Sequence, residues 1–127
     1  MNWTVNAYRE AVLRMTIRGA EGEDLEIEAV VDTGFNGALT LPESLIASLR
    51  LPFRRRGRAM LADGSECLFD VYEAVVISEG EPRRISVDGA DTPPLMGMAL
   101  MAGCELLIQV VDGGKVTLSP LSESERA

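Results

Sequence analysis

The chain has 127 residues, the usual size of one domain, and 46% of them are hydrophobic, which argues against a disordered protein. Its 20 acidic and 12 basic residues give a formal net charge of −8, so neither nucleic acid nor an anionic membrane is expected as the main partner. With no histidine, a Ser-His-Asp or Cys-His mechanism is excluded within this chain, and two cysteines are too few for a disulfide framework.

Residues 1–12 lack the charged start and the unbroken apolar core of a signal peptide, and no apolar run is long enough to cross a bilayer. We therefore expect a soluble, cytoplasmic protein. The sequence has no internal repeat, low-complexity segment or linker. Residues 1–127 are accordingly expected to form a single domain, with a polar tail at about 120–127.

A β-hairpin is predicted at residues 11–31. Apolar residues alternate with glutamates over residues 24–31, which is the period of a strand with one buried face. Residues 11–18 alternate less cleanly, and the turn-rich segment 19–24 joins the two runs.

One short helix is predicted after a short strand at residues 38–41. Thr40 and Glu43 have the spacing of a capping box, and Pro42 falls in the first turn. An apolar stripe follows at Leu45, Ile46 and Leu49, as expected for a helix with one buried side.

The second half of the chain is predicted to be mostly strands. They are expected at residues 58–62, 66–78, 83–87, 104–111 and 115–121. Turns are expected at Asp63-Gly64, Asp88-Gly89 and Asp112-Gly113, and residues 91–103 are expected to be a loop that feeds a small apolar segment. The pattern predicts an all-β fold, a small barrel or sandwich with one or two short helices.

Several side chains are assigned ordinary roles. The basic run of Arg54, Arg55, Arg56 and Arg58 is expected to be a solvated loop or an edge strand. Core filling is expected for Met15, Met60, Met96, Met98 and Met101. Buried free thiols are expected for Cys67 and Cys104, and a packing role for Tyr72.

The carboxylate of Asp32 follows the apolar run 29–31, where an acid costs free energy unless it is solvated, paired or functional. One interpretation is an Asx-type turn, in which Asp32 accepts hydrogen bonds from backbone N–H groups. The other is a catalytic Asp-Thr-Gly, in which Gly34 permits a tight turn and the approach of a substrate, while Thr33 locks the turn through its hydroxyl. The tripeptide alone does not decide between them.

Two further features accompany the tripeptide. Residues 94–101 form a second apolar segment that contains Gly97, and the predicted Asp63-Gly64 hairpin lies between this segment and Asp32. With these features in this order, residues 11–118 resemble the retropepsin-like aspartic proteases, in particular their small single-domain prokaryotic members. The resemblance implies an all-β fold, a small closed β-barrel of the retropepsin-like (acid protease) type.

The resemblance also implies roles for individual residues. Asp32 would be the catalytic aspartate, Thr33 an inter-subunit hydroxyl clasp, and Gly34 a contact to the substrate backbone. Residues 60–70 would form a flap, and Gly97 would lie in the segment packed behind the active-site loop. The residues expected to bind substrate are Phe35, Asn36, Ala62, Asp63 and Gly64.

Catalysis of this kind needs two carboxylates, one ionised to take a proton from water and one protonated to polarise the scissile carbonyl. The chain has a single Asp-Thr-Gly, so the second carboxylate would be Asp32 of another copy, related by a two-fold axis. We expect an aspartic endopeptidase that is active as a homodimer on a peptide or protein substrate, with no metal, cofactor or covalent intermediate. The terminal segments 2–8 and 115–121 would supply contacts between the copies.

The chain departs from viral members of this family in three places. Phe35-Asn36 replaces Ala-Asp, the flap tip at residues 62–65 carries a charge instead of being rich in glycine, and Met98 stands where an arginine braces the viral dimer. These departures motivate an alternative function, a catalytically weak or inactive retropepsin-like dimer acting as a peptide-binding or complex-organising module. A third interpretation is an unrelated small β-barrel in which Asp32 is only a turn residue.

Overall fold

A computed structural model describes residues 1–126. Its strands are β1 (Asn2–Thr4), β2 (Val12–Arg18), β3 (Asp24–Val31), β4 (Leu39–Leu41), β5 (Phe53–Met60), β6 (Glu66–Ser78), β7 (Glu81–Gly89), β8 (Leu95–Met96), β9 (Cys104–Ile108) and β10 (Lys115–Pro120). Its helices are α1 (Glu43–Leu49), α2 (Met98–Met101) and α3 (Glu123–Arg126). Over the part of the chain described, no helix is long and apolar enough to cross a membrane.

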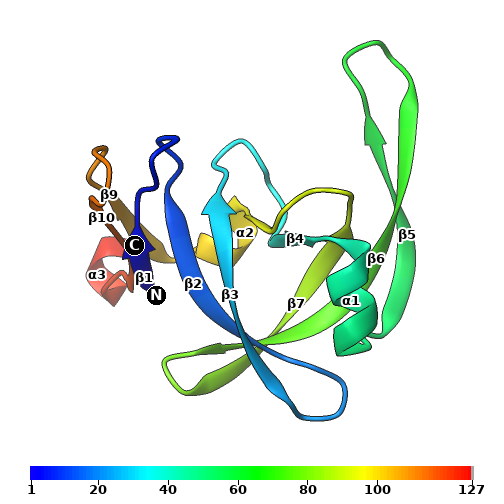
Figure 1. The fold of residues 1–127 in the computed structure, drawn as a ribbon, viewed down its shortest axis with the longest axis horizontal. Helices are drawn as coiled ribbons and strands as arrows, with labels where there is room; N and C mark the ends of the chain where they lie inside the picture. Colours follow the sequence, from blue (N-terminus) through cyan, green and yellow to red (C-terminus); the bar gives the residue numbers. More distant parts are fainter. Residues whose placement is uncertain (127) are drawn as a thin grey trace.

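The strands form two sheets (Figure 1). Seven strands pair in the order β2-β3-β8-β4-β7-β6-β5, and β2 also pairs with β6, so the order from β2 to β6 returns on itself and β5 is left at an outer edge. The smaller sheet has the order β1-β10-β9. The predicted mostly β architecture with short helices is confirmed, whereas a closed barrel of the retropepsin-like type stays a prediction.

The predicted hairpin at residues 11–31 is confirmed. Strands β2 and β3 pair antiparallel, from Val12 opposite Val30 to Arg18 opposite Asp24. The alternation predicted for β3 is seen in its burial, since Ile27 and Ala29 are buried and Glu26 and Glu28 are exposed. This pairing fixes the position of the last residue of β3, Val31, and therefore the start of the Asp32 loop.

A short strand inserted between β3 and β4 decides the geometry of the segment between them. Strand β8 pairs parallel with β3 and antiparallel with β4. The chain therefore leaves β3 at Val31, passes through residues 32–38, and re-enters the sheet two strands away at Leu39. Leu39 and Met96 are both fully buried, so this part of the sheet is anchored in the core.

The core is one contiguous cluster of apolar side chains contributed by both sheets and by α1 and α2. Its least exposed members are Leu13, Ile17, Leu39, Leu41, Val76, Val87, Met96 and Val116. Because Val116 belongs to β10 and Leu13 to β2, the two sheets share this core.

The predicted helix exists, but its predicted capping box is wrong. Pro42 is the N-cap residue of α1, and no side chain caps its first turn. Thr40 is buried in β4, where its backbone is paired with Asp88 on one side and Leu95 on the other. Strand pairing therefore holds Thr40 in the sheet, away from the helix terminus.

The basic run was predicted to be either a solvated loop or an edge strand, and the structure shows an edge strand. It lies in β5, which pairs only with β6, and its arginines form cross-strand ion pairs Arg54–Glu73, Arg56–Asp70 and Arg58–Glu66. Exposed pairs of this kind contribute little to stability, but they place charge along a sheet edge and so disfavour its pairing with another chain. In Figure 1 the far half of this hairpin projects beyond the rest of the sheet.

Two of the methionine predictions are wrong. Met15, Met96 and Met101 are buried as predicted, but Met60 is 76% exposed and Met98 is 48% exposed. Met60 lies on the projecting hairpin, which has no core beneath it, and Met98 starts α2, whose buried positions are Leu100 and Met101.

The predictions of buried thiols and of one turn also fail. Cys67 is exposed because it lies on the projecting hairpin, opposite Ala59, and Cys104 is only half-buried. Asp88-Gly89 is not a turn. These residues continue β7, because Asp88 is paired with Thr40 of β4 and with Val71 of β6.

Candidate active site

The Asp32 side chain lies at the start of a tight turn after β3. The Phe35 N–H donates to the Asp32 carbonyl at 3.1 Å, and the Gly34 N–H donates to Asp32 Oδ1 at 3.0 Å. The Asx-type bond of the first interpretation is therefore present. It uses one carboxylate oxygen, and within residues 1–126 Oδ2 makes no hydrogen bond or ion pair, so Asp32 both closes the turn and leaves an oxygen free.

Backbone hydrogen bonds hold this loop against the segment that follows β8. Asp32 N–H donates to the Met96 carbonyl at 2.9 Å, and Met98 N–H donates to the Phe35 carbonyl at 2.8 Å. Two further bonds join Gly97 N–H to Ala38 O and Ala99 N–H to Gly37 O, at 2.9 and 3.1 Å. The segment around Gly97 thus packs behind the Asp32 loop, as predicted.

Position 97 has no room for a side chain, so a glycine is needed there. Gly97 is buried, and a Cβ on it would collide with the Gly37 carbonyl oxygen and come within 2.6 Å of a ring carbon of Phe35. Its φ of −103° is open to any residue, so close approach of the backbone explains the glycine. The loop and its support are in contact along their backbones.

Several polar groups of the loop are free to bind another molecule. Over the described residues, the Thr33 hydroxyl and the Asn36 amide make no hydrogen bond, and both residues are exposed. No ion pair there includes Asp32, although Asp32 is only partly exposed. No group of three or more His, Cys, Asp or Glu side chains in residues 1–126 is placed to hold a metal ion.

The predicted flap is the far half of the β5–β6 hairpin, and its predicted turn is confirmed. Leu61 N–H donates to Ser65 O and Gly64 N–H to Leu61 O, with Gly64 at a φ of 87° that favours glycine. Asp63 Oδ1 accepts from the Ser65 N–H at 2.9 Å and from its hydroxyl at 2.6 Å. These two bonds hold the pKa of the Asp63 carboxyl below its ordinary value. The bond from the Ser65 hydroxyl lowers the pKa most, and the bond from the Ser65 N–H adds to it.

The predicted site residues form two groups. Residues 32–36 are brought together by the turn after β3, and residues 62–64 by the flap turn. Figure 1 shows both at the same end of the molecule, the top in that view. No hydrogen bond or ion pair among residues 1–126 joins one group to the other.

An open groove runs between the returning strand of the flap and the end of β7. Its lining residues are Glu43, Arg56, Cys67, Leu68, Phe69, Asp70, Gly89 and Ala90. Tyr72 lies beside it, donates a 3.2 Å hydrogen bond to Glu43 Oε2, and packs edge to face on Phe53. The pKa of the Tyr72 hydroxyl is raised, mainly by burial and then by the nearby Glu43 carboxylate. Tyr72 therefore stays neutral and has the packing role that was predicted for it.

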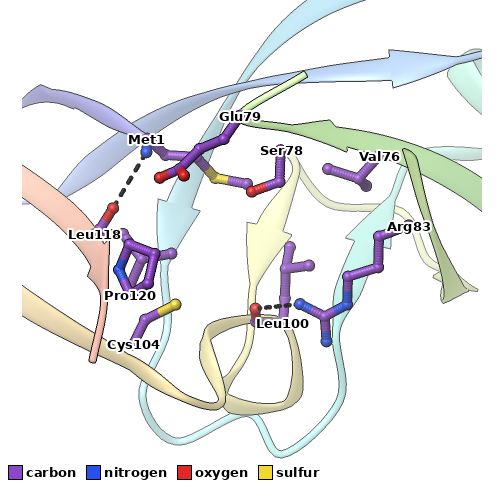
Figure 2. Close-up of a pocket in the computed structure, with 9 residues that line it drawn as sticks. All are labelled: Met1, Val76, Ser78, Glu79, Arg83, Leu100, Cys104, Leu118 and Pro120. Carbon is purple, nitrogen blue, oxygen red and sulfur yellow. Dashed lines mark hydrogen bonds between the residues drawn. The ribbon is translucent and has the colours of Figure 1, made fainter. Parts of the chain in front are cut away.

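Sequence reasoning missed Arg83, which braces the segment behind the loop. Figure 2 shows its guanidinium reaching from β7 to α2, where Nη1 donates to the Leu100 carbonyl at 3.1 Å and Nη2 to the Ala99 carbonyl at 3.2 Å. A cation suits the carbonyl end of a helix. The sequence around Arg83 shows only an arginine within a predicted strand, which is too common to predict hydrogen bonds to a remote helix.

The cavity beside Arg83 is not a substrate site. It has a volume of about 40 Å³ and lies between the β6–β7 hairpin, which contributes Val76 and Arg83, and the segments that contribute Met1, Leu100 and Leu118 (Figure 2). None of the predicted site residues lines it, and its size is that of a small packing void.

Comparisons with known proteins give a likeness to solved structures, but no family model matches the chain and no curated protein matches its sequence. Among solved structures, the chain is similar to a retropepsin-like aspartic protease from Rickettsia conorii, with 16% identity, a TM-score of 0.49, and coverage of 89% of this chain and 96% of that one. A likeness of this strength decides nothing by itself, so the function has to be inferred from the residues of this chain.

Acid is expected to weaken the hydrogen bonds that Asp63 accepts in the flap turn. Because the pKa of folded Asp63 is lowered, the turn bonds are fully present above the ordinary aspartate pKa and are lost as the pH falls through the lowered value. We expect Ser65→Ala, which removes the hydroxyl and keeps the N–H, to raise the Asp63 pKa part of the way back. Carboxyl-detected NMR titration measures it, with Ser86→Ala on β7 as control. An Asp63 pKa unchanged by Ser65→Ala would contradict this description of the turn.

Proposed function

We propose that the chain is an aspartic endopeptidase of the retropepsin-like type, active as a homodimer with one site per dimer. The observation that carries the proposal is the state of Asp32. One of its oxygens is fixed by the Gly34 N–H, the other is free, and no basic side chain pairs with it in residues 1–126. A carboxylate that is positioned by a backbone hydrogen bond and left without an ion pair, at the end of a half-buried strand, is available to act as a general acid or base.

The reaction needs a second carboxylate, and a second copy of Asp32 is the candidate. Two carboxyl groups in contact share one proton, because the first negative charge opposes the second ionisation. The ionised member would take a proton from a water molecule as its oxygen adds to the peptide carbonyl, while the protonated member donates a hydrogen bond to the carbonyl oxygen. The carboxyl group that took the proton from water then gives a proton to the amide nitrogen, and the C–N bond breaks to leave a carboxylic acid and an amine.

The exposed groups of the loop support this arrangement. The Thr33 hydroxyl, which makes no hydrogen bond within residues 1–126, is available to clasp its counterpart in the partner copy. Gly34 and Asn36 would contact an extended substrate backbone from one side. The flap residues Ala62, Asp63 and Gly64 would contact it from the other, in the manner of an added strand.

An exposed apolar surface supports self-association. Strand β9 is an edge of the smaller sheet, with Leu107 45% exposed, and the loop after it exposes Val110 at 66% and Val111 at 64%. Figure 1 shows this loop at the same end of the molecule as the Asp32 loop. The terminal segments 2–8 and 115–121 were expected to supply contacts between the copies. Strands β1 and β10 of these segments pair with each other within the chain, and we assign the contact to the exposed apolar residues of β9 and its loop.

Asp32→Asn is expected to abolish peptide cleavage and to preserve the fold. The amide oxygen of asparagine can still accept the Gly34 N–H bond, but it cannot transfer a proton, so we expect kcat to fall by at least about 100-fold. Mass spectrometry of an unstructured peptide library measures cleavage. Asp24→Asn, at the far end of β3, removes an exposed ion pair and serves as the matched control.

The alternative function gives the opposite result in the same assay. A catalytically weak or inactive dimer that binds peptides or organises a complex would bind library peptides equally well with and without the Asp32→Asn substitution, and would cleave none of them. Cleavage that persists in Asp32→Asn would exclude the proposed role of Asp32.

Val111→Glu is expected to weaken the dimer. A charge in an apolar contact acts twice in a two-fold interface, and we expect the dimer Kd to rise by about 30-fold or more, equivalent to about 2 kcal/mol. Sedimentation velocity over a concentration series measures it. Leu25→Glu is the matched control, since Leu25 is an exposed apolar residue near the start of β3, in the other sheet. An unchanged Kd in Val111→Glu would place the contact elsewhere.

A further inference from the structure

The ring of Phe35 is enclosed by two glycines from different segments. A Cβ built on Gly37 would have three Phe35 ring carbons as its nearest atoms, at 2.5, 2.6 and 3.5 Å. A Cβ built on Gly97 would meet another ring carbon at 2.6 Å. Gly37 belongs to the Asp32 loop and Gly97 to the segment behind it, so the ring spans the boundary between the two.

Both glycines are explained by the room that the ring and the backbone need. Neither has a φ in the left-handed region, so an alanine would be allowed by backbone conformation at either position. At Gly37 the obstacle is the Phe35 side chain. At Gly97 the obstacle also includes the carbonyl oxygens of Gly37 and Phe35, which cannot move aside without breaking the loop.

We infer that Phe35 is a positioning residue that fixes the Asp32 loop against the segment 96–99. Its ring lies between Gly37 of the loop and Gly97 of this segment. Its N–H donates to the Asp32 carbonyl, and its carbonyl accepts from the Met98 N–H. Ring and backbone together thus hold the residue three positions after the reactive carboxylate. The consequence for catalysis rests on the proposed function, but the consequence for loop order does not.

This role differs from a substrate contact in what it changes. A subsite residue alters KM and the preferred substrate side chain, whereas a positioning residue alters the placement of Asp32, and a small misplacement lowers the rate of the chemical step. We expect Phe35→Leu to reduce kcat by about 10- to 100-fold with KM nearly unchanged.

Loop order is measured by amide hydrogen exchange of the purified, unliganded protein. The reporters are the hydrogen-bonded N–H groups of Phe35, Gly97, Met98 and Ala99. We expect each of Phe35→Leu, Phe35→Ala and Gly37→Ala to speed their exchange by about 10-fold or more, because each removes or displaces the ring.

A double-mutant cycle tests whether the ring is the cause. Adding Gly37→Ala to Phe35→Ala should cause little further acceleration, because the obstacle is already gone. Gly97→Ala should disrupt the loop with or without the ring, since its Cβ also meets backbone oxygens. Phe69 packs on Gly57 of β5 in the same way, so Phe69→Ala is the matched control and should leave the four reporters unchanged.

The inference is overturned if the reporters exchange at the wild-type rate in both Phe35→Leu and Gly37→Ala, or if Gly37→Ala acts equally with and without the ring. A rise in KM in Phe35→Leu with kcat unchanged would overturn it in favour of a subsite. If no peptide is ever cleaved, the proposed function fails, and the exchange data still decide whether the ring holds the loop.

Discussion

The rest of the site depends on the backbone hydrogen bonds between residues 32–38 and 96–99. They exist because β8 is inserted between β3 and β4, which forces the chain to cross over it in a loop. Once this loop is tied down, Asp32 has a fixed backbone, a fixed Oδ1 and a free Oδ2. A carboxylate positioned by backbone hydrogen bonds does not need a neighbouring cation to hold it, and a cation would neutralise the charge that proton transfer requires.

The same constraint explains which parts of the chain have to be small. Gly97 admits the loop backbone, and Gly37 admits the Phe35 ring, so the loop and the segment 96–99 can pack closely against each other. Arg83 adds a second support by bonding the carbonyls at the end of α2. The flap has the opposite character, because it projects from the sheet and exposes Met60 and Leu61.

Local sequence patterns predicted the parts of the molecule that local forces decide. Alternation indicated the hairpin before Asp32, and Asp63-Gly64 indicated the flap turn, because strand period and turn chemistry act over a few residues. The insertion of β8 could not be predicted, since it joins segments that are remote along the chain. Thr40 looked like a helix cap because its pairing partners, Asp88 and Leu95, are likewise remote. Met60 and Cys67 looked buried because composition does not reveal that a hairpin lacks a core beneath it.

The proposed site exists only if Asp32 meets its own copy across a two-fold axis. The most direct measurement is the distance between the two Asp32 carboxyl groups in a crystal structure of the purified protein. We predict a symmetric dimer with the closest carboxyl oxygens about 3 Å apart, the separation at which two acids share a proton. A monomer at millimolar concentration, or a dimer whose Asp32 residues lie on opposite sides of the assembly, would contradict the proposed dyad.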